Sequence, residues 1–136
     1  MEHPAVDLKE RTKSFALRVM RVVRSLPPGA EGRMIGHQLL RSATSVAANY
    51  RAVCRARSRA EFLAKLAIAL EEADESAFWL ELLVDGGVMT EGRLRDLRSE
   101  ANQLVAIFNA SRTTAKKGSH SIINNQESTI PDRKAS

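Results

Sequence analysis

The sequence predicts an all-α protein, an antiparallel up-and-down four-helix bundle followed by a disordered C-terminal tail. Apolar residues recur at alternating spacings of three and four, which is typical of helices that pack at shallow angles. No stretch alternates with the period of a strand, and short connections join the four periodic segments. Aromatic residues make up only 4% of the 136 residues, which suits a core built from Leu, Ala and Val.

The first two helices have recognisable boundaries. The first is expected from about Asp7, which can cap it, to Ser25, where Pro27-Pro28-Gly29 ends it. The second is expected from about Gly32 to Arg55. Their inward stripes are Leu8, Thr12, Phe15, Val19, Val22 and Leu26 in the first helix, and Ile35, Leu39, Ser42, Val46, Asn49 and Val53 in the second.

The third helix is expected from Ser58 to Asp85, because Ser58 and Glu61 form a capping box and Gly86-Gly87 follows. Thr90 can cap the fourth helix. The expected core stripes are Leu63, Leu66, Leu70, Ala73, Ala77, Leu80 and Val84 in the third helix, with Phe62 and Leu83 at the edge, and Leu94, Leu97, Ala101, Leu104 and Phe108 in the fourth.

The chain is expected to form one folded domain. Residues 1–6 are predicted to be a flexible N-terminus, residues 7–114 the bundle, and residues 115–136 the disordered tail. From about Ser111 the sequence loses its periodicity and becomes rich in Ser, Asn, Thr and Lys. The start carries no apolar segment typical of a signal peptide, and no apolar run is long enough to span a bilayer. A cytoplasmic protein without membrane contact is therefore expected.

A second apolar face on the third helix predicts self-association. Opposite the expected core stripe lies another heptad-like line with the only tryptophan beside it. A helix of a monomeric bundle has one apolar face, so a second one indicates a further partner, most simply another copy of the chain. The candidate interface residues are Ile68, Glu71, Glu75, Phe78, Trp79 and Leu82. The alternative is that these are scattered surface hydrophobic residues, which are common.

Charge is segregated along the chain. Between Ser14 and Arg59 there are nine arginines and a single acid, Glu31, whereas residues 60–91 hold eight acids and a single base, Lys65. Neighbouring antiparallel helices would bring Arg51 and Arg55 near the acidic helix, where a buried carboxylate needs a partner. Asn49, among small residues on the inward stripe, is expected to fix the register of packing, and Arg51 to form a structural ion pair.

The sequence offers no recognisable catalytic constellation. Di-iron bundles use Glu-x-x-His pairs, and none occurs here. The three histidines, His3, His37 and His120, are not spaced as metal ligands. Cys54 is expected to be a small buried thiol, and no Gly-rich phosphate loop or Ser-His-Asp set is found. We expect no catalytic residue, no cofactor, no metal and no small-molecule substrate.

The stretch from Ser45 to Leu83 resembles the family called four helix bundle protein, or 23S rRNA-intervening-sequence protein. The residues that carry the resemblance are Ser45-Val46, Asn49, Arg51, Ser58, Glu61-Phe62, Lys65-Leu66, Glu72, Glu75 and Trp79-Leu80-Glu81-Leu82-Leu83. The likeness covers about residues 14–110. Many members read Asn-Ile-Ala-Glu-Gly where this chain has Asn49-Tyr50-Arg51-Ala52-Val53, which places the chain in a divergent branch.

The resemblance implies an antiparallel bundle that assembles as a ring-like homo-oligomer, a homopentamer. The biochemical role of the family is not established. A related group, the accessory proteins of diversity-generating retroelements, is similar in fold. That group partners a reverse transcriptase and binds nucleic acid through a basic surface.

Nucleic-acid binding is the functional hypothesis that follows. Symmetry would copy the exposed arginines into a basic ring that binds RNA or DNA without sequence preference. The candidates are Arg18, Arg21 and Arg24 on the first helix and Arg55, Arg57 and Arg59 at the turn between the second and third. The alternative is a protein-interaction scaffold or accessory subunit, without nucleic-acid binding, whose basic face meets an acidic protein.

Overall fold

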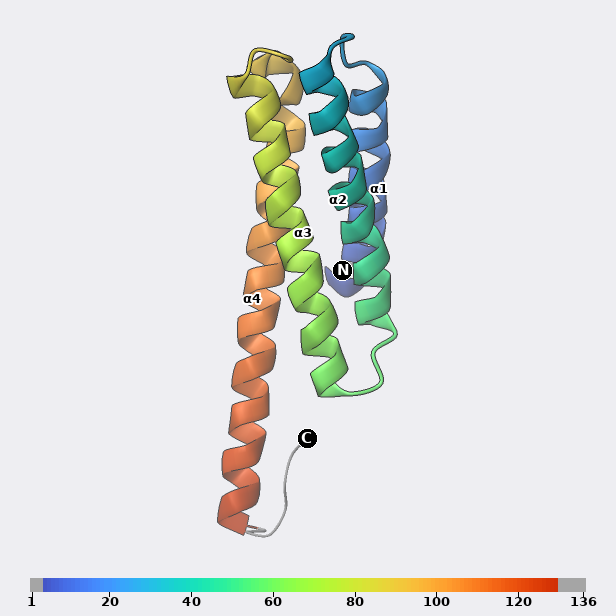
Figure 1. Cartoon of the computed structure of the whole chain (residues 1–136). Helices are drawn as coiled ribbons and strands as arrows, with labels where there is room; N and C mark the ends of the chain where they lie inside the picture. The colour runs from blue at the N-terminus through green and yellow to red at the C-terminus, as the bar shows by residue number, and fades with distance from the viewer. Residues whose placement is uncertain (1–3, 130–136) are drawn as a thin grey trace.

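Four helices make up the part of the chain that the structure describes, and no strand occurs within it. The structure is a computed structural model that describes the backbone of residues 4–129 and the side chains of residues 8–118. The helices are α1 (Pro4–Arg24), α2 (Ala30–Cys54), α3 (Arg59–Asp85) and α4 (Glu91–Thr129). Figure 1 shows them running up, down, up and down, with the α1–α2 and α3–α4 connections at one end and the α2–α3 turn at the other. The predicted all-α, four-helix architecture is confirmed.

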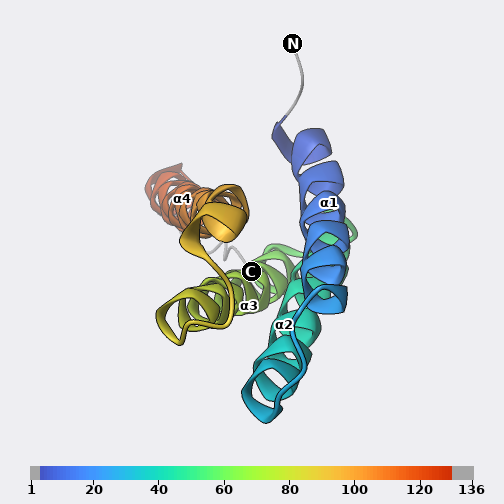
Figure 2. The same cartoon turned by 90° about the horizontal axis from the view of Figure 1, so that it is seen from above.

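The helices follow one another around the bundle in chain order, as the view along the axis shows (Figure 2). Each helix packs on the helices that precede and follow it in the chain. The contact between α1 and α4, which closes the bundle, is the smallest. That contact includes a polar clamp, because Arg11 donates to both carboxylate oxygens of Glu100, at 2.7 and 3.0 Å, and to Gln103 at 3.2 Å. A paired guanidinium fixes the relative position of two helices that share little apolar surface.

The predicted helix caps explain where α3 and α4 begin. The hydroxyl of Ser58 accepts a hydrogen bond from the Glu61 N–H at 3.0 Å. The Glu61 carboxylate accepts from the Arg57 N–H at 2.8 Å, one residue before the position that a standard capping box uses. Thr90 accepts in the same way from the Arg93 N–H at 3.3 Å. These bonds satisfy backbone donors that have no partner inside a helix.

The core contains the predicted stripes of α1, α2 and α4 almost unchanged. Thr12 is fully buried among the apolar residues of α1, and its hydroxyl donates to the Lys9 carbonyl oxygen at 3.2 Å. The buried stripe of α3 differs from the prediction. It consists of Leu66, Ala69, Ala73, Ser76, Leu80 and Leu83, and the predicted members Leu63, Leu70, Ala77 and Val84 are only half-buried. The stripe is rotated because α3 packs between α2 and α4, so its most buried line faces the space between them.

A buried serine pair joins α2 to α3. The hydroxyl groups of Ser42 and Ser76 lie 2.8 Å apart, and both residues are fully buried. Each is also close to a carbonyl oxygen of its own helix, Ser42 to Leu39 at 3.2 Å and Ser76 to Glu72 at 2.8 Å. Because each hydroxyl has a partner, the pair can be buried at little free-energy cost and it fixes the register of the two helices.

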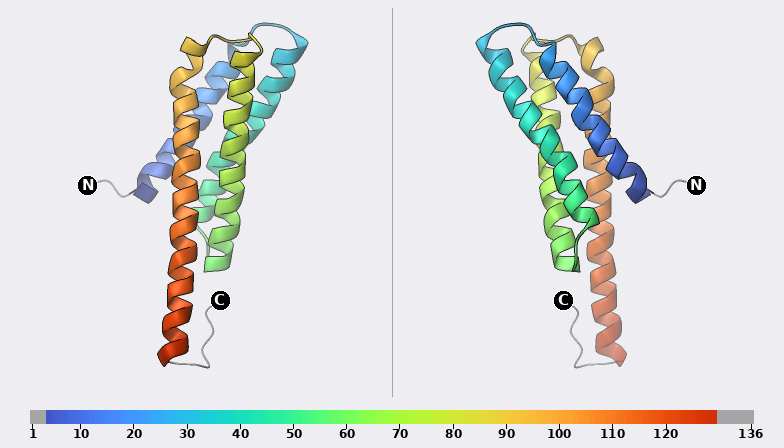
Figure 3. Two further views of the ribbon diagram at one scale, coloured as in Figure 1. Left: turned by 90° about the vertical axis from the view of Figure 1, so that its left-hand side faces the viewer. Right: turned by 90° about the vertical axis from the view of Figure 1, so that its right-hand side faces the viewer.

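α4 is longer than the sequence predicted. The bundle was expected to end at residue 114, but α4 continues to Thr129 and extends past the α2–α3 turn (Figure 3). The backbone carbonyl of Ala115 accepts a hydrogen bond from Arg59 at 3.0 Å, which ties this part of α4 to the start of α3. Residues 1–3 and 130–136, where a flexible N-terminus and the end of a disordered tail were predicted, lie outside the described residues. Within the described part, no helix is both long and apolar enough to cross a bilayer.

Candidate nucleic-acid interface and self-association face

The six candidate arginines fall into two groups at opposite ends of the bundle. Arg18, Arg21 and Arg24 lie in the last turns of α1, near the end that carries the α1–α2 and α3–α4 connections (Figure 1). Arg55, Arg57 and Arg59 lie at the α2–α3 turn. The 25 residues of α2 separate the groups, about 37 Å at 1.5 Å per residue. The two groups therefore lie far apart within a subunit.

Cations at the α2–α3 end line two adjoining hollows. A hollow of about 380 Å³ between α1 and α2 is lined by Lys9, Glu10, Lys13, Ala47, Ala48 and Arg51. A second hollow shares Ala48 and Arg51 with it and extends to Arg55, Arg57 and Glu61. We call the five cations of this end the α2–α3 basic surface: Lys9, Lys13, Arg51, Arg55 and Arg57. Two carboxylates, Glu10 and Glu61, accompany them.

Most cations of the α2–α3 basic surface are available to a ligand. Among the described residues, no carboxylate lies within ion-pair distance of Lys9, Lys13, Arg51 or Arg55. Arg57 alone is paired, at 3.8 Å from Glu61, and its side chain is 89% exposed. Sequence reasoning missed Lys9 and Lys13, because only the packing of α1 against α2 brings them beside Arg51.

Arg59 is less available than the prediction assumed. Its guanidinium donates to the Ala115 carbonyl oxygen on α4, and the side chain is half-buried. At the other end of the bundle, Arg21 and Arg24 are exposed, and Arg18 is half-buried. Arg93, from the first turn of α4, lies near them and donates to Ser25 at 3.4 Å.

The aromatic residues of the bundle offer little for base stacking. Tyr50 is buried and stacks on Phe108 with ring centroids 5.7 Å apart. Burial, together with a smaller effect of the neighbouring Cys54, raises the pKa of Tyr50 to about 12. Cys54 itself is exposed at the end of α2, so the prediction of a buried thiol is wrong. The last turn of α2 turns this position to solvent while Tyr50 and Val53 point inward.

The second apolar face of α3 lies on the outside of the bundle. Ile68 is 37% exposed and Phe78 is 50% exposed, although both are large apolar residues. Glu71 is exposed beside them, and Trp79 and Leu82 are half-buried at the margin. Phe78 and Trp79 pack edge to face at 5.0 Å, so the two rings form one apolar patch. Trp79 also packs against the core, so Phe78 and Ile68 are the parts of this face that remain open to solvent.

A charged network supports Trp79. The indole N–H donates to the Glu75 carboxylate at 2.9 Å. Arg41 on α2 donates to Glu75 as well, and to Glu72 at 3.2 Å. The predicted interhelical ion pair therefore exists, but Arg41 forms it in place of Arg51 or Arg55. The reason is the level along the bundle: Arg41 is adjacent to Ser42, which faces Ser76, whereas Arg51 lies near the end of α2.

The hydrogen bond from Trp79 lowers the pKa of Glu75 below its usual value of 4.5; burial opposes this in part, and Arg41 lowers the pKa further. A lowered pKa stabilises the folded state above the unfolded-state pKa, and this contribution is lost as the pH falls through the folded-state pKa. We expect wild type to melt above Glu75→Gln at neutral pH, with a gap that narrows as the pH falls from neutral to below the usual carboxyl pKa of 4.5. Thermal melts across that range test this, and a gap independent of pH would contradict it.

Asn49 was expected to fix the register of helix packing, but its side chain bonds within α2. Its side-chain amide donates to the Ser45 carbonyl oxygen and lies near the Ser45 hydroxyl, both at 2.9 Å, and the residue is half-buried. Its amide is thus used inside α2, one turn back. The contact that joins α2 to α3 through buried polar atoms is the Ser42–Ser76 pair.

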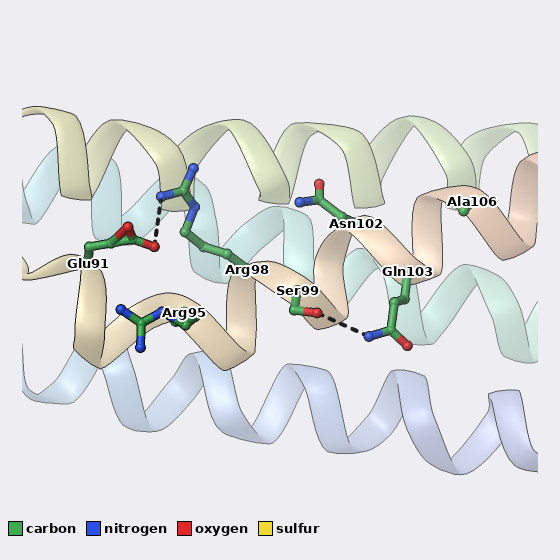
Figure 4. Close-up of a pocket in the computed structure, with 7 residues that line it drawn as sticks. All are labelled: Glu91, Arg95, Arg98, Ser99, Asn102, Gln103 and Ala106. Carbon is green, nitrogen blue, oxygen red and sulfur yellow. Dashed lines mark hydrogen bonds and ion pairs between the residues drawn. The ribbon is translucent and has the colours of Figure 1, made fainter.

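A shallow polar hollow lies along α4 (Figure 4). Glu91 and Arg98 form a loose pair at 4.0 Å, and Gln103 donates to Ser99 at 3.1 Å. All its lining residues belong to one helix: Glu91, Arg95, Arg98, Ser99, Asn102, Gln103 and Ala106. Within the described residues, no group of three or more His, Cys, Asp or Glu side chains is placed to hold a metal ion.

Comparison with known proteins identifies the family. The sequence profile of the 23S rRNA-intervening sequence proteins matches residues 5–110, which covers α1 from its second residue, all of α2 and α3, and the first part of α4. The chain belongs to the 23S rRNA-intervening sequence protein family. The predicted resemblance is thereby confirmed.

A solved structure agrees with this membership of the 23S rRNA-intervening sequence protein family. The chain is similar to a protein of unknown function from the S23 ribosomal protein family of Bacteroides thetaiotaomicron VPI-5482. The two share 30% sequence identity, and the match covers 80% of this chain and 97% of the other, with a TM-score of 0.74. No protein with a curated description is significantly similar in sequence.

Proposed function

We propose that this member of the 23S rRNA-intervening sequence protein family is a non-enzymatic homo-oligomer that binds RNA or DNA through the α2–α3 basic surface. The observation that carries the proposal is the group of cations at this end, of which Lys9, Lys13, Arg51 and Arg55 have no ion-pair partner among the described residues. Cations left unpaired in this way can replace the counterions of a phosphate backbone.

Self-association is supported by the exposed apolar patch of α3. Half of the Phe78 surface and more than a third of Ile68 are exposed in the single subunit. A second copy that covered them would remove apolar area from water, which is the main driving force for association. We propose a ring of five subunits, as the family resemblance implies. A ring repeats the α2–α3 basic surface on one face and so multiplies its phosphate contacts.

The proposed binding has a characteristic salt dependence. Contacts between cations and phosphates release condensed counterions, so affinity falls steeply as salt rises. A surface that makes six to ten such contacts loses roughly a thousandfold or more in affinity between about 50 and about 200 mM salt. Tyr50 is buried and Phe62, which lines a hollow beside Arg57, is half-buried, so stacking is limited at this end and little sequence preference is expected.

One observation favours a second candidate function. Tyr50 and Phe108 are buried, Phe62 is half-buried, and Trp79 lies on α3 away from the α2–α3 basic surface, so base stacking contributes little there. A protein partner with an acidic surface would need no stacking. In that case the chain would be an interaction scaffold or accessory subunit, and its basic end would meet carboxylates.

A gel-shift titration separates the two functions. We expect wild-type protein to retard a random single-stranded RNA at about 50 mM salt and to lose this at about 200 mM. Arg55→Glu with Lys13→Glu should abolish retardation. The matched control is Arg21→Glu with Arg24→Glu at the other end, which should preserve it. Absence of retardation at low salt would favour the scaffold, and stoichiometric metal in the purified protein would contradict a non-enzymatic role.

A further inference from the structure

The outward face of α2 is positively charged, and the outward face of α3 is negatively charged. The α2 stripe consists of Arg33, Met34, His37, Arg41, Thr44 and Ala48, all of them exposed. The α3 stripe consists of Ile68, Glu71, Asp74, Phe78, Glu81 and Asp85, all of them exposed as well. The α2 stripe contains no acid and the α3 stripe contains no base. Both follow helical spacings, so each forms a continuous face.

We propose that subunits associate head to tail, with the α3 stripe of one copy docked on the α2 stripe of the next. This inference rests on the proposed homo-oligomer and specifies which faces build it. A contact between two different faces of the same chain is heterologous, and it closes into a ring when the rotation allows. Opposite charges on the two faces favour this pairing over α3 against α3, which would bring acids together.

The two stripes also occupy the same stretch of the bundle. The Ser42–Ser76 contact at 2.8 Å marks one level on both helices. Arg33 lies nine residues from Ser42, and Asp85 lies nine residues from Ser76 toward the same end, about 14 Å in each case. A rotation about an axis parallel to the bundle does not change the position of any residue along that axis. Arg33 of one copy would therefore meet Asp85 of the next.

Counting residues from the Ser42–Ser76 contact also pairs the other polar residues of the two stripes. His37 is level with Glu81, five residues from the serine pair. Thr44 is level with Asp74, two residues away on the other side. Both pairs join a possible donor to a carboxylate, as the Arg33–Asp85 pair does.

The apolar members of the stripes match in the same way. Arg41 is level with Phe78 to within one residue, where a guanidinium can lie over the ring. Ile68 falls within two residues of the level of Ala48, whose small side chain leaves room for it. Met34, 55% exposed, comes near Leu82.

The distribution of exposed apolar residues supports these two faces. Within the described residues, the large apolar side chains that remain exposed are Leu17, Met34, Ile68 and Phe78. Three of the four lie on the two stripes, and Leu17 lies on α1. The α2 stripe ends at Ala48, which also lines the hollows of the α2–α3 basic surface, but none of the five cations of that surface belongs to either stripe.

Charge reversal provides the first test. Arg33→Glu puts a negative charge in the first turns of α2, and Asp85→Arg puts a positive charge at the end of α3, so both favour their helix dipoles and should preserve folding. We expect each single variant to raise the dissociation concentration of the oligomer at least tenfold. The double variant Arg33→Glu/Asp85→Arg should restore assembly. Matched controls on α4, Arg95→Glu and Asp96→Arg, should leave it unchanged.

Cysteine cross-linking provides a second test. In a Cys54→Ser background, Thr44→Cys and Asp74→Cys proteins should form a disulfide-linked dimer when mixed, and neither should do so alone. A dimer of Asp74→Cys protein alone would indicate α3 against α3 and overturn the proposal. An oligomer unaffected by either charge reversal would also overturn it, but would leave self-association intact. A wild-type mass near the 15.0 kDa of one chain would refute the proposed oligomer itself.

Discussion

Replacing Phe108 by alanine is expected to lower the free energy of unfolding by about 3–5 kcal/mol. The side chain is fully buried on α4 and stacks on Tyr50 of α2, so truncation leaves a cavity beside a ring that loses its partner. Urea denaturation followed by circular dichroism measures the loss. The matched control is Leu17→Ala, because Leu17 is 44% exposed and should change stability by about 0.5 kcal/mol or less. Equal effects of the two changes would contradict the described core.

Replacing Phe78 by arginine is expected to convert the proposed oligomer to a species of one chain. The ring is half exposed on the outer face of α3, so the substitution should leave the fold of the subunit intact while placing a charge where an apolar contact is proposed. Light scattering should report a mass near 15.0 kDa at micromolar concentration. Leu17→Arg, at a similarly exposed position on α1, should retain the wild-type mass. An unchanged oligomer in Phe78→Arg would exclude this face as the contact.

The four helices and several of their ends followed from local signals, but α1 begins at Pro4, so the predicted cap Asp7 lies inside the helix. Ser58 and Thr90 accept the hydrogen bonds that their positions predicted, because a cap depends on residues three apart in one chain segment. Thr12 lies in the core because its neighbours at helical spacing are apolar. The second apolar face of α3 was readable for the same reason. The extension of α4 beyond residue 114 was not, because its sequence carries no apolar stripe there.

The pairing of charged groups could not be read from the chain. The sequence suggested that Arg51 or Arg55 meets the acidic helix, and the structure has Arg41 in that place. Periodicity gives the face of a helix on which a residue lies, but it does not give the position of one helix relative to another along the bundle axis. That position is set by how Ser42 packs on Ser76, a contact between residues 34 positions apart.

The sequence by itself determined that this protein is helical, where its helices lie, which family it belongs to, and that α3 is apolar on two sides. Only the tertiary structure decided which arginine pairs with Glu75, that the candidate arginines divide between two ends, and that Lys9 and Lys13 join one of those ends. Helix periodicity and capping are local properties of a chain segment, so composition and spacing reveal them. The level and rotation of one helix against another depend on packing, which a single sequence does not record.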